Sequence, residues 1–175
     1  MSVKGKMLHL MMRHRHLFKG KIKREVITKR TSVEKLRKEC DEAAERLSGM
    51  PEGVSIETAW SAPVYAEWII PEGAEENKAI LYFHGGCYIM GNAKSHRGIV
   101  GNFANHVGYK TLLFNYRLAP EFPAPAAVND SAAIYQWMLE QGYRPEDIIF
   151  AGDSAGGGIE IGTLIKLRDE GIPLP

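Results

Sequence analysis

The chain has 175 residues, of which 45% are hydrophobic and 25% charged, and its formal net charge is +1. This length suits one globular domain, and the near-neutral charge gives no indication of nucleic-acid binding. No stretch approaches the roughly 18 apolar residues of a membrane-spanning helix, so we expect no such span. Cys40 and Cys87 form neither a CxxC motif nor a disulfide framework, which predicts a reduced, cytoplasmic protein.

The charge is unevenly distributed along the chain. Residues 1–30 contain ten of the 22 Lys and Arg residues, and their only acid is Glu25. Apolar residues between Met7 and Phe18 are mixed with these cations. One interpretation is contact of this basic segment with an anionic membrane surface. The plainer interpretation is a cationic amphipathic helix that packs over the rest of the protein.

The first 50 residues are predicted to form two helices. Thr31 and Glu34 have the spacing of a capping box, which would open the second helix. Its apolar stripe continues to Leu47, and Pro51 follows its end. From residue 54 to residue 70 the chain alternates or runs apolar, which predicts an antiparallel hairpin at a sheet edge. An acidic turn is expected over residues 71–77.

Strands and helices then alternate. Apolar runs predict strands at 79–83, 111–115 and 147–151, and helical spacing predicts helices at 95–106, 126–139 and 159–169. This order indicates an α/β fold with a mostly parallel sheet, helices on both of its faces and right-handed crossovers. In such sheets the chemistry lies at the carboxyl ends of the strands.

Residues 152–156 read Gly-Asp-Ser-Ala-Gly, a G-x-S-x-G pattern around Ser154. The pattern alone also fits an ordinary glycine-rich turn. Here a buried apolar run precedes the serine and a helical pattern follows it, as a nucleophile elbow requires. The flanking Gly152 and Gly156 would leave room where the chain doubles back.

A second glycine-containing loop, His84-Gly85-Gly86-Cys87, follows the strand predicted at 79–83. Glycines let backbone N–H groups turn into a cavity, where they can stabilise the oxyanion of an acyl-transfer intermediate. A plain loop is the alternative. About seventy residues separate this loop from Ser154, which is room for two strand–helix units. That spacing would bring the two loops side by side.

Three blocks in this order, "FHGGCYIMG", "NYRLAPEFPAP" and "FAGDSAGGG", resemble the hormone-sensitive-lipase-like (GDXG) carboxylesterases of the α/β-hydrolase fold. The resemblance implies a helical cap in residues 1–50 and the N-terminal part of the hydrolase domain in 51–175. It implies that Ser154 is the nucleophile and that Asp130 is a supporting buried acid. Residues 116–121 would order the neighbourhood of the site. The oxyanion hole would comprise Gly85, Gly86, Cys87 and Ala155, with Gly85 shaping the loop and the other three donating N–H groups. The motif would be supported by His84, Gly152, Asp153 and Gly156, with His84 structural and Asp153 distinct from the triad acid.

Two features depart from the family pattern. Cys87 replaces the third glycine of the usual HGGG loop, either as a harmless small residue or as a thiol at the mouth of the site that is open to alkylation or oxidation. The family order is Ser, then Asp or Glu, then His, yet no histidine follows Ser154. The acids after it all lie in the following helix. We therefore expect an N-terminal fragment that ends after the elbow helix, lacks the triad acid and histidine, and is inactive alone.

The function that the resemblance implies is hydrolysis of short-chain carboxylic esters through an acyl-enzyme on Ser154. Its partner would be a small-molecule ester, and no metal, cofactor or nucleic acid is implied. One alternative is a non-catalytic small-ligand-binding protein on the same fold, as in the plant gibberellin receptors. Another is an inactive truncated gene product. The oligomeric state is not indicated by the sequence.

Overall fold

The computed structural model describes residues 3–14, 31–47 and 49–175. It divides into two units, residues 1–31 and 32–175, which are described separately. The first contains helix α1 (Val3–Arg13). Residues 15–30 of the basic segment lie outside the described part, so both interpretations of that segment remain predictions. Among the described residues, no helix combines the length and the apolar character that a bilayer crossing requires.

The second unit contains four α-helices and five strands. The helices are α2 (Val33–Leu47), α3 (Ala93–Val107), α4 (Ala126–Glu140) and α5 (Ala155–Asp169). The strands are β1 (Val54–Thr58), β2 (Ala66–Pro71), β3 (Glu75–Phe83), β4 (Tyr109–Phe114) and β5 (Ile148–Gly152). The three-residue 3₁₀ turn at Pro145–Asp147 leads into β5.

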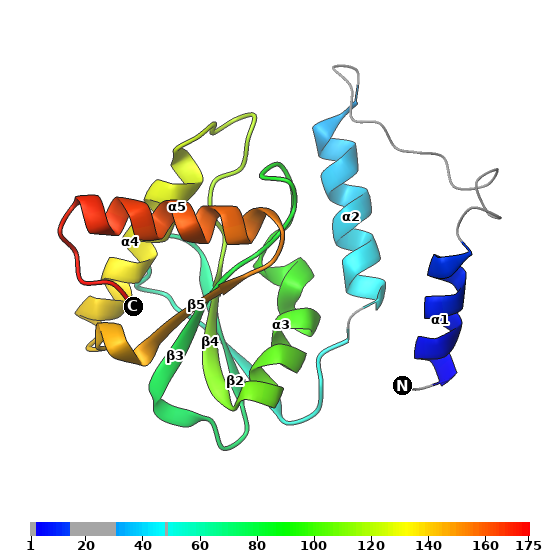
Figure 1. Ribbon diagram of the computed structural model, residues 1–175, viewed down its shortest axis with the longest axis horizontal. Coiled ribbons are helices and arrows are strands. Elements are labelled where there is room, and N and C mark those ends of the chain that lie inside the picture. The colour runs from blue at the N-terminus through cyan, green and yellow to red at the C-terminus, as the bar shows by residue number, and fades with distance from the viewer. Residues whose placement is uncertain (1–2, 15–30, 48) are drawn as a thin grey trace. The chain divides into compact units, whose positions relative to one another are not determined.

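The five strands form one mixed sheet in the order β1-β2-β4-β3-β5 (Figure 1). Strands β3, β4 and β5 run parallel, and β1 and β2 form an antiparallel hairpin that joins the sheet through β4. The α/β class and the hairpin at the sheet edge are thereby confirmed. The other edge of the sheet is β5, the strand that leads to Ser154.

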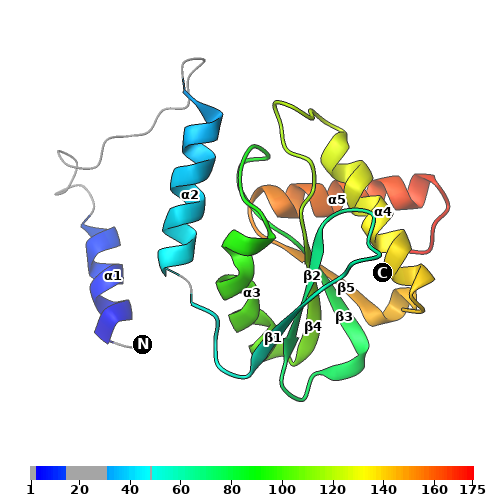
Figure 2. The ribbon, with the colours of Figure 1, turned by 180° about the vertical axis from the view of Figure 1, so that it is seen from behind.

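Helices cover both faces of the sheet (Figures 1 and 2). Helices α4 and α5 pack together on one face, and α3 covers the opposite face with α2 against it. Alternate side chains of each strand enter different layers: Phe83 and Leu112 belong to the core beneath α4 and α5. Tyr82 and Leu113 belong to the smaller core beneath α3. Burial on both faces explains the continuous apolar runs in the sequence.

The acidic turn is shorter than expected. Glu75 already belongs to β3, where its amide donates to the carbonyl of Gly108 at 3.0 Å. The turn itself closes with a bond from the amide of Ala74 to the carbonyl of Pro71. The side chains of residues 75–77 are exposed, so their polar character does not prevent main-chain pairing.

The start of α2 has a side-chain acceptor next to the predicted capping residue. The Oγ atom of Ser32 accepts a hydrogen bond from the amide of Lys35 at 3.2 Å, and the capping box of Thr31 and Glu34 remains a prediction. Ser32 immediately precedes Val33, the first helical residue. Ser and Thr cap helices in the same way, so two adjacent candidates cannot be separated by sequence pattern alone.

Candidate active site

Ser154 lies at the turn between β5 and α5. Its backbone has φ 52° and ψ −116°, a conformation that non-glycine residues rarely adopt. Such a residue costs about 1–3 kcal/mol and persists only where the surroundings enforce it. A nucleophile elbow requires a strained strand-to-helix turn of this kind. The side chain is exposed, and its Oγ atom makes no hydrogen bond to any of the residues that the structure describes.

The elbow fits because two glycines let α5 pass directly over the end of β3. A Cβ atom on Gly156 would collide with the carbonyl oxygen of Phe83, and one on Gly152 would lie 2.9 Å from the same oxygen. The amide of Asp153 donates to that carbonyl at 3.3 Å, and the amide of Gly156 donates to the carbonyl of Asp153 at 2.7 Å. The end of β3 is therefore the platform on which the elbow rests.

The loop after β3 has three consecutive residues with positive φ. Gly86, Cys87 and Tyr88 have positive φ values of 131°, 54° and 64°. The amides of Ile89 and Met90 both donate to the carbonyl of Gly86 at 3.0 Å. A Cβ atom on Gly86 would collide with the carbonyl of Met90, so only glycine fits there. Within the described part of the chain, the N–H groups of Gly86 and Cys87 have no protein acceptor.

Asp153 joins the elbow to this loop. Its Oδ1 atom accepts a hydrogen bond from the amide of Gly85 at 2.8 Å. That N–H group is therefore not available to a substrate, and the resemblance implies only a loop-shaping role for Gly85. The donors that remain are the N–H groups of Gly86, Cys87 and Ala155, the last being the first residue of α5. A helix N-terminus leaves its first N–H groups unpaired and favours negative charge.

His84 is fully buried beneath the loop. Its ring stacks on Tyr116 at a centroid distance of 4.1 Å, and the Tyr116 hydroxyl donates to the His84 carbonyl at 2.6 Å. Its Nδ1 atom lies 2.8 Å from the carbonyl of Gly85, so the neutral ring carries its proton there. Burial lowers the pKa of His84 to about 4. These contacts suit a residue that orders the loop and moves no protons.

His96, which the sequence reasoning did not single out, lies beside this group. Its ring centroid is 5.1 Å from that of His84, and its Nε2 atom is 4.0 Å from Oδ1 of Asp153. Its Nδ1 atom lies 3.1 Å from the carbonyl of Asn92, the N-cap residue of α3. No short motif in the sequence marks this position.

The segment after β4 is held by a buried acid. Asp130 accepts bonds from the backbone amide of Arg117 at 2.9 Å and from the Arg117 guanidinium at 2.7 and 3.0 Å. Such a bidentate, charge-assisted pair fixes geometry as well as charge. The resemblance implied both a buried acid at this position and an ordering role for residues 116–121.

Neither Cys40 nor Cys87 is in a disulfide, and Cys87 is exposed on the loop after β3. Its left-handed backbone shows that a residue other than glycine fits this position. The exposure of its side chain leaves the thiol open to reagents. In the described part of the chain, no three His, Cys, Asp or Glu side chains gather closely enough to hold a metal ion.

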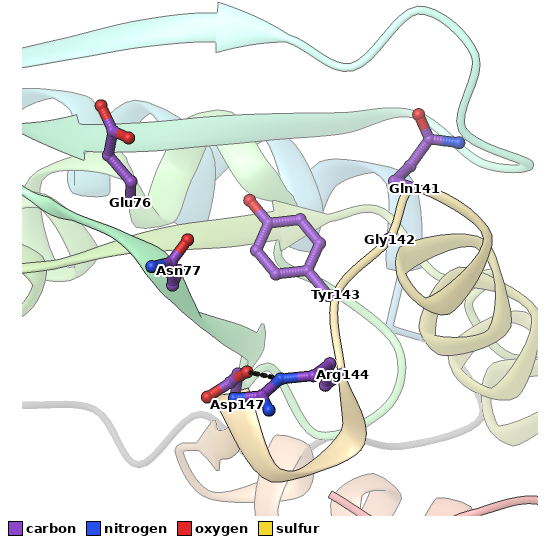
Figure 3. Close-up of a pocket in the computed structure, with 7 residues that line it drawn as sticks. All are labelled: Glu76, Asn77, Gln141, Gly142, Tyr143, Arg144 and Asp147. Atoms are coloured by element: carbon purple, nitrogen blue, oxygen red, sulfur yellow. Dashed lines mark hydrogen bonds and ion pairs between the residues drawn. The ribbon is translucent and has the colours of Figure 1, made fainter.

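Two hollows differ in their relation to the elbow. An open one of about 470 Å³ lies between the start of β3 and the connection from α4 to β5, where Arg144 pairs with Asp147 (Figure 3). It is at the amino ends of the parallel strands, opposite Ser154. A smaller one of about 130 Å³, mostly apolar, lies between Tyr88 of the oxyanion loop and Ile159 of α5. Catalytic sites of parallel sheets lie at the carboxyl ends, as this second hollow does.

The three histidines of residues 32–175 have partners other than Ser154. His84 is buried against Tyr116, His96 faces Asp153, and His106 contacts the carbonyl of Asn102 at 2.9 Å. None of these three bonds to Ser154 in the described structure. The arrangement thus combines a strained serine and free oxyanion donors without a general base from this unit.

Comparison with known proteins gives the family. The profile of a family described as alpha/beta hydrolase fold matches residues 80–175. An acetyl-hydrolase of Streptomyces hygroscopicus is 44% identical over 110 residues, which are 63% of this chain and 36% of the relative. The solved structure of EstE5 is 36% identical with a TM-score of 0.83, over 94% of this chain and 54% of its own. An esterase of the bacterial hormone-sensitive lipase family is 38% identical with a TM-score of 0.79, over 85% of this chain and 50% of its own.

The chain therefore belongs to the hormone-sensitive-lipase-like family of the α/β-hydrolase fold. The relatives carry the names of esterases and hydrolases. This chain spans about a third of the Streptomyces relative and about half of the two solved structures.

Proposed function

We propose that this chain carries the nucleophile and the oxyanion hole of a serine carboxylesterase that hydrolyses small carboxylic esters. The observation that carries the proposal is that two features lie together. Ser154 has a strained backbone and an Oγ atom without a hydrogen bond to the described residues, and the nearby N–H groups have no protein acceptor among them. These N–H groups belong to Gly86, Cys87 and Ala155. Donors fixed before the reaction stabilise a developing oxyanion without reorganisation.

The reaction would proceed in two acyl transfers. The Oγ atom of Ser154 attacks the ester carbonyl carbon while a base takes the hydroxyl proton, and the carbonyl oxygen becomes an oxyanion held by the three N–H groups. Collapse expels the alcohol, which receives that proton, and leaves an acyl-enzyme. Water then attacks the acyl carbon and releases the acid and Ser154.

The base and its carboxylate partner are not supplied by residues 32–175. We propose that they come from a part of the longer relatives that this chain does not span, and that the 175 residues alone hydrolyse no ester. Without a base, a serine hydroxyl is barely nucleophilic at neutral pH. The alternative function is non-catalytic binding of a small ligand on the same fold. An inactive triad-bearing form would favour this alternative.

The hollow of about 130 Å³ beside the elbow supports a short acyl chain as substrate. The contacts of α2 with both loops of the site support a cap role for this helix. A cap contributed by the whole of residues 1–50 remains a prediction. The exposed thiol of Cys87 supports the cytoplasmic location that belongs to the same proposal.

The test uses a triad-bearing form, in which this chain is completed with the part of its longer relatives that it does not span. Hydrolysis of p-nitrophenyl acetate and butyrate is measured for the parent and for Ser154→Ala. Loss of a nucleophile costs on the order of 10⁶ in turnover. The control Ser55→Ala changes a serine on β1, whose Oγ contacts the carbonyl of Ile70. If Ser154→Ala keeps the parent rate, Ser154 is not the nucleophile.

A second measurement addresses the 175-residue chain itself. A fluorophosphonate probe should leave Ser154 unlabelled in this chain and label it rapidly in the triad-bearing form. Rapid, saturable labelling in the 175 residues alone would contradict the proposed origin of the base.

A further inference from the structure

One arginine of α2 reaches both loops that border the elbow. The Nε atom of Arg37 donates to the carbonyl of Ile89 at 2.6 Å, in the oxyanion loop. Its Nη2 atom donates to the carbonyl of Ala119 at 2.9 Å, in the segment after β4. The guanidinium also pairs with both carboxylate oxygens of Glu121, at 2.9 and 2.7 Å. One side chain of α2 thus contacts two loops whose residues lie 52 to 84 positions further along the chain.

The oxyanion loop needs such external support. Its residues Cys87 and Tyr88 have positive φ without being glycine, which is a strained conformation. Three carbonyl groups in and beside the loop accept hydrogen bonds from three different residues outside it. The carbonyl of His84 accepts from the Tyr116 hydroxyl, and that of Tyr88 accepts from the amide of Ala119 at 2.9 Å. The carbonyl of Ile89 accepts from Arg37.

The contacts require the shape of arginine as well as its charge. The side chain of Arg37 is 26% exposed, so most of it is withdrawn from water. Its planar fork donates in three directions, to two carbonyls and one carboxylate, which a single ammonium group on a flexible stem cannot reproduce. The bond to Ile89 lies two residues beyond Cys87.

We propose that Arg37 is a positioning residue of the oxyanion hole: by holding the carbonyl of Ile89, it keeps the N–H groups of Gly86 and Cys87 aligned with Ser154. This inference rests on the proposed function for its catalytic meaning. The structural part concerns the order of the loop and is measurable without catalysis.

The first experiment measures amide hydrogen exchange by NMR in the 175-residue chain. The amides of Ile89 and Met90 report on the loop, because both donate to the carbonyl of Gly86. In Arg37→Met, we expect their exchange to accelerate by about tenfold or more, the effect of losing a hydrogen bond from a charged donor. Arg37→Lys keeps the charge without the fork and should also accelerate exchange. Full protection in the lysine variant would show that charge alone suffices and would overturn the proposal.

Arg144→Met is the matched control. Arg144 pairs with Asp147 at 2.6 Å and with Glu146 at 3.3 Å, at the opposite end of the strands (Figure 3). We expect it to leave the exchange of Ile89 and Met90 within about twofold of the parent, because exposed ion pairs contribute little. Acceleration equal to that of Arg37→Met would indicate general loosening and would overturn the proposal. Circular dichroism shows whether Arg37→Met folds. If it does not fold, the exchange of Ile89 and Met90 in Arg37→Lys tests the proposal.

The second experiment measures ester hydrolysis in the triad-bearing form. Loss of oxyanion alignment should lower kcat by about tenfold or more in Arg37→Lys while KM changes by less than about threefold. A change in KM with constant kcat would overturn the positioning role. If the parent form is inactive, the proposed function fails, whereas the exchange result still decides whether Arg37 orders the loop.

Discussion

The carboxylate of Asp153 and the backbone amide of Gly85 meet at 2.8 Å, although they are 68 residues apart in the sequence. This bond couples the residue before the proposed nucleophile, Ser154, to the loop that carries the proposed oxyanion donors. A Cβ atom on Gly85 would collide with the same carboxylate, so the aspartate and the glycine require each other. The aspartate of the motif thus aligns the two halves of the site.

Replacing this aspartate tests the coupling. Asp153→Ala should lower the free energy of unfolding by about 1.5 kcal/mol, the lower range for a hydrogen bond to a charged group because the side chain is 48% exposed. Asp153→Asn keeps an acceptor oxygen and should cost less. Urea unfolding at constant m value measures both. The control Asp169→Ala removes an exposed ion pair with Arg168 and should change little. An alanine variant as stable as the parent would contradict the coupling.

Two adjacent glycines of the elbow helix provide a matched pair. In Gly156→Ala the new methyl group would meet the carbonyl of Phe83, which is backbone and cannot move aside. We expect a loss of more than about 3 kcal/mol in stability, or no folding. In Gly157→Ala the methyl group meets nothing within 4 Å. That change should stabilise the helix by about 0.5–1 kcal/mol. Thermal unfolding of the two variants measures this difference in stability. Equal melting temperatures would contradict the prediction.

The sequence predicted the parallel strands and the elbow because both are local patterns. The strand at 148–152 is a continuous apolar run, and the glycines around Ser154 stand at fixed offsets from it. Local order also placed the loop at 84–87 at the carboxyl end of its strand. Both loops therefore border the same end of the sheet.

The sequence could not show how these parts bond to one another. The resemblance implied that Gly85 shapes the loop, but no local pattern indicates that its N–H group bonds to an aspartate 68 residues away. Arg37 reaches the site from a helix whose own pattern indicates only an apolar stripe and a charged face. The start of α3 was placed two residues late because Asn92 and Ser95 form its capping box without the usual Glu. Such long-range partners depend on the assembled fold.

The buried His84 should make the free energy of unfolding depend on pH. Burial lowers its pKa to about 4 from an ordinary value of 6.5, so between these values the unfolded chain binds more protons than the folded chain. The free energy of unfolding therefore falls as the pH drops through this window. The contribution of His84 is fully present above pH 6.5. Between pH 6.5 and 5, this group alone should account for a loss of about 2 kcal/mol.

Carboxylates act at lower pH. Burial alone would raise the pKa of Glu67, but hydrogen bonds from Arg97 and Tyr65 lower it, so its contribution is lost only below about pH 4.5. Urea unfolding of the parent and of His84→Asn at pH 7, 6 and 5 separates the two effects. The variant should show a flatter slope, whatever its stability at pH 7. The control His106→Gln changes an exposed histidine of α3 and should keep the parent slope. Equal slopes in parent and His84→Asn would contradict the prediction.

The free edge of β5 predicts self-association of the 175-residue chain. This strand pairs with β3 on one side and forms the sheet edge on the other. It reads Ile-Ile-Phe-Ala-Gly, without charge or proline, and Ile149 is 45% exposed. Ile161 and Ile165 of the adjacent α5 are 60% and 46% exposed. An apolar edge strand with open N–H and C=O groups is a template for pairing with another chain.

Sedimentation equilibrium over a range of protein concentrations measures this association. Ile149→Lys places a charge on the edge, which native sheets use to prevent pairing, and should weaken association by about tenfold or more. The matched control is Ile99→Lys, because Ile99 is 56% exposed on α3, which packs against β2 and β4 and not at the edge strand β5. It should leave the association constant unchanged, since it places no charge on the β5 edge. A parent chain that stays monomeric at all concentrations would refute the prediction, and equal effects of the two lysines would assign the association to another surface.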